Sequence, residues 1–219
     1  MKLYKIGSKG EDVAQIQKAL HLYPDGVYGP LTREAVLAFQ RENGLAADGV
    51  VGPATLVKLI PLRFKKSKRK INEIIIHCSD TQEGCNFTAA DIRRWHRQQG
   101  WADIGYHYVV LRNGTVENGR DVDIVGAHCK NHNTHSIGVC YIGGSSAATG
   151  KPKDTRTLAQ KAALIKLLRD LKKLYPNAKI LGHRDTSPDK NHNGKIDKEE
   201  YIKDCPCFDA MLEYSSIFS

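Results

Sequence analysis

Two histidines and one cysteine stand where a protein could hold a catalytic metal ion. His77 follows the three isoleucines of Glu73-Ile-Ile-Ile76, and His183 follows Lys179-Ile-Leu-Gly182. Both runs are typical of short buried strands, and a polar residue at the end of such a strand can open into a site. Cys205 lies near the end of the chain, with Lys203 two residues before it. A catalytic zinc ion takes three protein ligands of these kinds and keeps one position open. The alternative is that both histidines are ordinary polar residues at strand ends.

The segments between these residues alternate between strands and helices. Thr88 is a suitable N-cap for one helix, and a second helix after Thr157 makes Leu158 and Leu168 available to the core. The turn Asn113-Gly114 joins two short apolar segments and predicts a hairpin. The predicted order is strand 73–79, helix 88–99, hairpin 105–117, strand 136–141, helix 157–174 and strand 179–183. This order indicates an α/β domain, with a central mixed β-sheet flanked by helices.

The first sixty residues contain an internal repeat. The segment Asp25-Gly-Val-Tyr-Gly-Pro-Leu-Thr32 recurs as Asp48-Gly-Val-Val-Gly-Pro-Ala-Thr55. In each copy Asp-Gly favours a tight turn, and the proline can open a helix. Apolar residues recur with helical spacing over 11–20 and 32–42, and Gln17 shares the inward face of the first of these helices. Residues 1–60 therefore predict a small three-helix domain in front of the α/β domain.

The positive charge of the chain is concentrated in one segment. The formal net charge is +9, and residues 61–70 contain six Lys or Arg and no acidic residue. Because the flanking segments are nearly neutral, a general nucleic-acid-binding domain is disfavoured. The run predicts a solvated, self-repelling linker over 61–70, with a tether to an anionic surface as the alternative. No apolar stretch approaches the ~20 residues needed to cross a bilayer, so we expect no integral membrane segment.

Residues 71–215 contain seven short motifs. In chain order they are Ile-Ile-His77-Cys-Ser, Gly105-Tyr106-His107-Tyr, Asn113-Gly-Thr-Val-Glu117-x-Gly-Arg120, Gly126-Ala-His128, Ser136-Ile-Gly-Val, Gly182-His183-Arg-Asp185 and Lys203-x-Cys205-Pro-x-Phe-Asp209. These motifs, in the same order, resemble those of the type 2 N-acetylmuramoyl-L-alanine amidases, the phage T7 lysozyme-like enzymes that are related to the peptidoglycan recognition proteins.

The resemblance implies a function and a set of site residues. It implies zinc as the cofactor, with His77, His183 and Cys205 as ligands, and it places Tyr106 and Lys203 as residues that assist catalysis. His128 matches a position that lines the substrate cleft. The reaction would be hydrolysis of the amide between N-acetylmuramic acid and L-alanine in bacterial peptidoglycan. Some relatives bind peptidoglycan without cutting it because they have lost the cysteine, whereas Cys205 is present here.

The N-terminal repeat resembles a second family. The pattern Gly7-x-x-Gly10-x-x-Val13-x-x-Ile16-Gln17-x-x-Leu20, the two Asp-Gly-Val-x-Gly-Pro turns and Phe39-Gln40 are similar to the peptidoglycan-binding domain type 1. This resemblance implies a non-catalytic module, residues 1–60, that holds the enzyme on its polymer. The alternative is a small helical domain with another partner.

The segment between His183 and Cys205 carries a further metal pattern. Residues 189–200 match the EF-hand loop in spacing, and they would offer calcium the oxygens of Asp189, Asn191, Asn193, Lys195 (through its carbonyl), Asp197 and Glu200. The flanking helices of an EF-hand are a poor match, so we expect an isolated calcium loop. The alternative is a polar turn without metal.

The remaining expectations concern cysteines, location and assembly. The pairs Cys78/Cys85 and Cys129/Cys140 are close enough in sequence for disulfides, but reduced thiols are the default for a chain without a secretory signal. We expect a monomeric phage or prophage endolysin, made in the host cytoplasm and reaching the wall through a lesion made by another protein. The alternatives are a non-catalytic peptidoglycan receptor and a zinc peptidase that cuts within the stem peptide.

Overall fold

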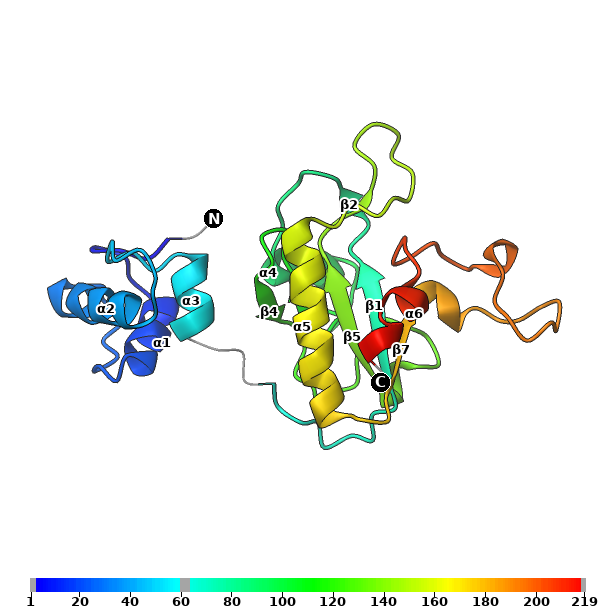
Figure 1. Cartoon of the computed structure of the whole chain (residues 1–219), viewed down its shortest axis with the longest axis horizontal. Coiled ribbons are helices and arrows are strands. Elements are labelled where there is room, and N and C mark those ends of the chain that lie inside the picture. The colour runs from blue at the N-terminus through cyan, green and yellow to red at the C-terminus, as the bar shows by residue number, and fades with distance from the viewer. Residues whose placement is uncertain (1–2, 60–63, 218–219) are drawn as a thin grey trace. The chain divides into compact units, whose positions relative to one another are not determined.

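The computed structural model describes residues 3–59 and 64–217, which fall into two compact units, Met1–Arg63 and Phe64–Ser219 (Figure 1). No helix within the described part of the chain has the length and apolar character needed to cross a membrane. The helices of the first unit are α1 (Glu11–Ala19), α2 (Pro30–Glu42) and α3 (Pro53–Leu59). The strands of the second unit are β1 (Glu73–Cys78), β2 (Thr81–Gln82), β3 (Tyr108–Val110), β4 (Val116–Asn118), β5 (Ser136–Tyr141), β6 (Gly144–Ser145) and β7 (Lys179–Gly182). Its helices are α4 (Ala89–Gln98), α5 (Leu158–Leu174) and α6 (Ala210–Glu213), with short 3-10 turns at η1 (Asn133–His135), η2 (His183–Thr186), η3 (Lys198–Glu200) and η4 (Ser215–Ile217).

A buried glutamine in each repeat organises the first unit. Gln17 Nε2 donates to Asp25 Oδ1 (2.7 Å), Val27 O (3.0 Å) and Thr32 Oγ1 (3.1 Å), and its Oε1 accepts from the Gly26 amide (2.9 Å). Both ends of the side chain are therefore used to close the Asp-Gly turn against the helices. This accounts for a polar residue on the inward face of α1.

The second repeat reproduces the same bonds. Gln40 Nε2 donates to Asp48 Oδ1, Val50 O and Thr55 Oγ1, and Gln40 Oε1 accepts from the Gly49 amide. The buried Tyr28 joins the two copies, since its hydroxyl donates to Gly49 O (3.0 Å). The repeat seen in the sequence is thus a repeat of structure, and the predicted three helices are confirmed.

The second unit is built on a five-stranded mixed sheet, as predicted. The strand order is β4-β3-β5-β1-β7, in which only β4 runs antiparallel to its neighbour. Strands β3 and β4 are the predicted hairpin. The central strands β1 and β5 are buried nearly along their whole length, because helices cover both faces of the sheet.

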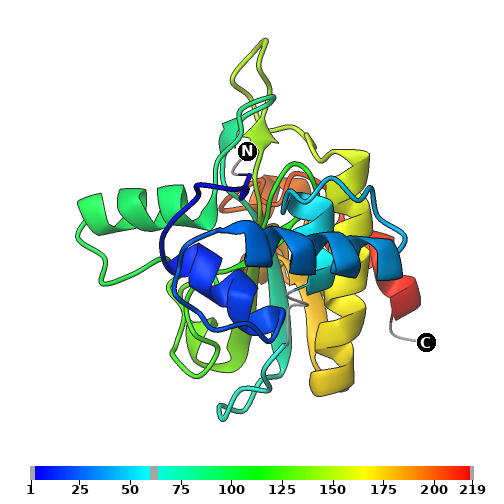
Figure 2. The same cartoon turned by 90° about the vertical axis from the view of Figure 1, so that its left-hand side faces the viewer.

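Helices α4 and α5 lie on opposite faces of this sheet (Figure 2). Thr88 and Thr157 cap them, each in a reciprocal capping box with the residue three positions later. The expectation that Leu158 faces the core is wrong, because this side chain is 87% exposed. Buried Gln160 sets the inward face of α5 instead, donating to Val110 O and Ile142 O, and Leu171 lies on the same face.

The basic segment differs from the linker predicted over 61–70. Residues 61–63 lie outside the described residues, but residues 64–70 belong to the second unit. Phe64 packs edge-on against Tyr108, with 5.4 Å between ring centroids, and Ser67 is buried. Lys65 pairs with Asp123 at 2.5 Å. A charge count does not reveal this packing, because it ignores the apolar and hydroxyl residues between the lysines.

Arg69 anchors the same segment by donating to backbone carbonyls. Its guanidinium reaches Val122 O (2.9 Å), Asn133 O (3.0 Å), Thr134 O (3.2 Å) and Ser136 O (3.2 Å). One of the six basic residues of the run therefore has a structural role, because four backbone carbonyl oxygens stabilise its positive charge.

Replacing Gln17 by alanine is expected to destabilise the first unit by about 1–3 kcal/mol, because the polar groups that close the turn lose their partner inside the protein. Hydrogen exchange of residues 3–59 in the intact chain measures this free energy. Gln15→Ala is the matched control, because Gln15 is exposed on the same helix. Equal exchange in the two variants would contradict the role given to Gln17.

Candidate metal centre and active site

His77 and His183 meet because their strands are parallel neighbours. In the register of β1 with β7, Ile76 pairs with Gly182, and the residue that follows each of them in the chain is a histidine. The two imidazole rings lie 4.7 Å apart between centroids. Two residues 106 positions apart in the sequence thus reach one point at the carboxyl end of the sheet.

Cys205 completes the group. One nitrogen of His77, one nitrogen of His183 and the Cys205 sulfur all lie within 4.8 Å of one another, a set that could hold a metal ion. His77 Nδ1 lies 3.8 Å from the sulfur, and the Cys78 amide donates to the sulfur at 3.2 Å. The three predicted ligands are therefore brought together, and an N–H donor is aimed at the sulfur, as suits a thiolate.

The chain after Cys205 is held against the sheet by packing. A Cβ on Gly182 would lie 2.6 Å from Pro206, so glycine at the end of β7 permits this close approach. Tyr141 donates its hydroxyl to Pro206 O (2.8 Å). The next residue but one, Phe208, is buried, and the Arg156 guanidinium lies 3.1 Å from the centre of its ring. These contacts fix the segment that carries the cysteine.

The environment favours neutral imidazoles. Burial lowers the pKa of His183 to about 4, with the charge of Lys203 adding to the effect. Burial also lowers the pKa of His77 well below its usual range, with His128 and His183 contributing. A neutral imidazole has a free lone pair for a metal ion, so both rings are prepared for coordination at neutral pH.

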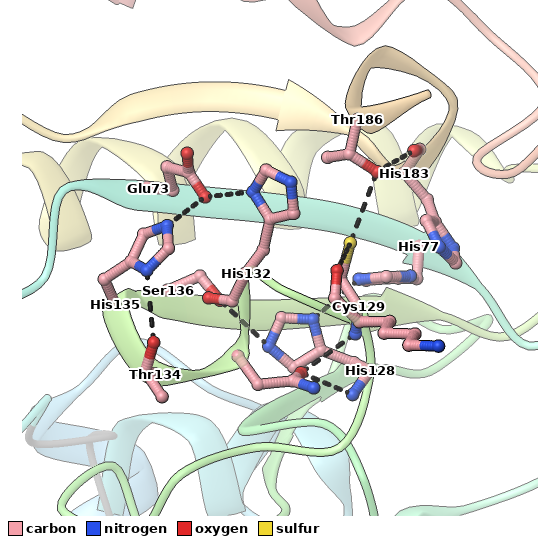
Figure 3. A network of polar contacts seen from close by, with 12 residues as sticks. Glu73, His77, His128, Cys129, His132, Thr134, His135, Ser136, His183 and Thr186 are labelled. Atoms are coloured by element: carbon pink, nitrogen blue, oxygen red, sulfur yellow. Dashed lines mark hydrogen bonds and ion pairs between the residues drawn. The ribbon is translucent and has the colours of Figure 1, made fainter. Parts of the chain in front are cut away.

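His128 lines the cavity at this site, and it also has a bonding role that the sequence did not indicate. His128 Nδ1 lies 3.0 Å from His77 Nε2, on the side of the His77 ring away from Cys205 (Figure 3). On its other side, His128 Nε2 contacts Ser136 Oγ at 3.3 Å, and Ser136 donates to His132 O at 2.7 Å. This chain fixes the orientation of the His77 ring, as partners of metal ligands commonly do.

A glycine makes room for His128. A Cβ on Gly138, in β5, would lie 2.5 Å from the His128 ring. The His128 ring can therefore occupy this place only because this strand position has no side chain. His107 is also buried there, and its Nδ1 accepts from the Gly138 amide at 2.9 Å, so this ring is bound into the fold.

A cavity of about 490 Å³ opens beside the three ligands. Tyr106, His128, His183, Lys203 and Cys205 all line it. The Tyr106 ring lies 5.2 Å from that of His77, and burial raises the pKa of Tyr106 well above its usual range. Lys203 is exposed, so its ammonium group is free to meet a ligand in the cavity.

The wall of the cavity includes residues that sequence reasoning had missed as site residues. His96, Gln99 and Trp101 come from the end of α4 and the turn after it. The His96 and Trp101 rings lie 4.4 Å apart. The half-exposed tryptophan in this turn was the one available signal, since exposed aromatic residues often mark binding surfaces.

All six cysteines, which lie within the described residues, carry free thiols. Neither Cys78/Cys85 nor Cys129/Cys140 forms a bridge. Instead Cys78 Sγ lies 3.8 Å from Cys207 Sγ, and Cys207 is turned toward Gly144 O at 3.3 Å. Cys207 lies outside the group of three ligand atoms, which contains Cys205.

The predicted calcium loop forms a closed turn of the chain. Both carboxylate oxygens of Glu200 accept backbone amides, from Lys190 (2.7 Å) and Asn191 (3.0 Å) on one oxygen and from Asp197 (2.9 Å) on the other. Asp189 accepts from the Gly194 amide at 2.8 Å. The oxygen-bearing side chains thus turn into the loop, where hydrogen bonds occupy them.

Comparison with known proteins agrees with this geometry. The model of the N-acetylmuramoyl-L-alanine amidase family matches residues 67–199, and that of the peptidoglycan binding domain matches residues 9–59. A solved structure, the amidase LysC from Clostridium intestinale, has a TM-score of 0.51 over 71% of this chain and 94% of its own, and its 23% identity supports the fold alone.

Two relatives are close in sequence over most of their length. The endolysin of Enterobacteria phage K11 is 39% identical over 150 residues, which are 68% of this chain and 89% of that protein. The endolysin of Escherichia phage T7 is 39% identical over 144 residues, or 66% of this chain and 85% of that protein. With the strand-end histidines, the cysteine and the sheet in place, the chain belongs to the N-acetylmuramoyl-L-alanine amidase family.

Proposed function

We propose that this protein is a zinc-dependent endolysin that hydrolyses the amide between N-acetylmuramic acid and L-alanine in bacterial peptidoglycan. The observation that carries the proposal is the group of His77, His183 and Cys205, of which His183 and Cys205 line a cavity that Tyr106 and Lys203 also line. Family membership and the phage relatives support the same reaction.

The donor set fits zinc. Two neutral imidazoles and one thiolate are ligands that zinc prefers, and three protein ligands leave a position open for water or substrate. When bound, zinc lowers the pKa of its water toward about 7 and so makes hydroxide available near neutral pH. His128 holds the ring of His77 so that Nδ1 remains directed toward Cys205.

The protein's own side chains supply the remaining functions. Tyr106 keeps its proton, because burial raises its pKa, and its hydroxyl can donate a hydrogen bond to the substrate or to water. Lys203 brings a positive charge to the cavity, where it stabilises the negative charge that develops on the scissile carbonyl oxygen. Trp101 and His96 present an aromatic wall against which the substrate can pack.

The first unit holds the enzyme on its polymer. It matches the peptidoglycan binding domain family over residues 9–59. A module of modest affinity raises the local concentration of the catalytic unit near the wall. We propose that the protein acts as a monomer, is made in the host cytoplasm and reaches the wall when another protein opens the membrane.

Product analysis tests the reaction. Purified peptidoglycan should yield intact stem peptides with free L-alanine N-termini, detected by mass spectrometry, and Cys205→Ala should abolish their release because the zinc ligand is lost. Cys85→Ala is the matched control, because Cys85 is a free thiol outside the cavity wall. Cleavage within the stem peptide would favour a peptidase, and binding without any release would favour a receptor.

Lys203→Met should lower kcat by ~10²–10³-fold, because the group that stabilises the oxyanion is removed while the metal ligands remain. Lys130→Met, which removes an exposed lysine that does not line the cavity, should leave kcat unchanged. Zinc content measured on both variants distinguishes a loss of catalysis from a loss of metal. Full activity of Lys203→Met would remove this residue from the mechanism.

We also propose that the loop Asp189–Glu200 binds calcium and orders the segment that presents Lys203 and Cys205. Glu200, at the last position of the EF-hand pattern, is three residues before Lys203, and its side chain is turned into the loop. Six oxygen donors at EF-hand spacing suit calcium.

Calcium added to metal-stripped, zinc-restored protein should raise its melting temperature and give a binding isotherm in calorimetry. Glu200→Gln should weaken this binding because a bidentate carboxylate is lost. Its neighbour Glu199→Gln, which removes an exposed carboxylate outside the pattern, should bind normally. No heat of binding and no change in melting temperature with calcium would contradict the proposal.

A further inference from the structure

A second cluster of metal-binding side chains lies at the other end of β1 (Figure 3). Glu73 is the first residue of β1, whereas His77 is near its last. His132 and His135 belong to the turn that leads into β5, the strand beside β1. The three residues Glu73, His132 and His135 are called the strand-start cluster below.

The ligand atoms of the strand-start cluster converge. Glu73 Oε2 lies 2.8 Å from His132 Nδ1 and 3.3 Å from His135 Nε2, and all three ligand atoms lie within 4.8 Å of one another. Zinc holds nitrogen and oxygen ligands at about 2.0–2.2 Å, which places such ligands about 3–3.6 Å from each other in a tetrahedral site. The distances from Glu73 Oε2 to the two histidine nitrogens already lie near this range.

The surrounding contacts orient the His135 ring and fix the backbone of His132. Thr134 Oγ1 lies 3.2 Å from His135 Nδ1, the ring nitrogen that does not face Glu73. The His132 carbonyl accepts from Ser136 Oγ at 2.7 Å, and the His132 amide donates to Cys129 O at 3.1 Å. A second hydrogen bond on the far ring nitrogen is the usual support of a metal-bound histidine.

The cluster is open to solvent, with exposed side-chain fractions of 16% for Glu73, 27% for His132 and 33% for His135. An ion can therefore enter, and water can complete its coordination. Two imidazoles and one carboxylate favour zinc and its neighbours in the first transition series over magnesium or calcium, which prefer oxygen alone.

We propose that Glu73, His132 and His135 form a second zinc site, separate from the His77/His183/Cys205 group. The proposal does not depend on the amidase function. The rival explanation is a plain ion pair between the carboxylate and one protonated histidine, with no affinity for metal beyond that of any surface histidine.

Zinc stoichiometry tests the proposal in the intact protein. After dialysis against buffered zinc with excess magnesium, metal analysis should find two zinc ions per chain. His135→Gln should keep one, because His135 lies outside the chain of contacts that runs from Ser136 through His128 to His77. His21→Asn is the matched control and should keep two, since His21 is an exposed histidine of the first unit whose positive φ suits asparagine.

Cobalt separates the two sites by their spectra. Cobalt in the cysteine site gives a thiolate-to-metal charge-transfer absorption, whereas cobalt in the strand-start cluster gives none because its ligands are nitrogen and oxygen. Cys205→Ser should therefore lose the charge-transfer band but still bind one cobalt ion, and Glu73→Gln in the same background should abolish that binding. One zinc ion in the wild-type chain, or two in His135→Gln, would overturn the proposal.

Discussion

The parallel pairing of β1 with β7 is the constraint on which the site depends. Because Ile76 lies opposite Gly182, the two histidines that follow lie side by side. Parallel strands need a long crossover, and α5 lies in the connection that leads from β5, on the other side of β1, to β7. The helix therefore contributes to the site without lining it, since its buried face packs on the sheet with Ile74 and Ile76 of β1.

The same edge of the sheet must also receive the C-terminal segment. Gly182 has no side chain, so Pro206 can pack against the end of β7 and bring Cys205 to the histidines. Burial then keeps the imidazoles neutral, and His128 orients one of them. The packing that brings Cys205 to the histidines also buries the strand ends, and this burial lowers the pKa values of the two imidazoles.

Strands, helices and the ligand group were predictable because each depends on local pattern or on the order of motifs. Thr88 and Thr157 mark their helices through capping, which acts within three residues. The errors concern long-range contacts. The partner of His128 is 51 positions away, and Arg69 reaches carbonyls more than 50 positions ahead, so neither contact is visible in the sequence. Leu158 was misplaced because apolar character alone does not say which side of a helix meets the sheet.

Two histidine-rich groups flank β1 and are joined through His128 and Ser136. β1 therefore has a group of potential metal ligands at each end, and its apolar central residues separate the two groups. The central claim is that the cysteine group holds the catalytic zinc. Anomalous diffraction at the zinc edge, from crystals grown with one equivalent of zinc, tests it most directly. We expect a peak bounded by His77 Nδ1, His183 and Cys205 Sγ. A peak elsewhere with none at these ligands would contradict it.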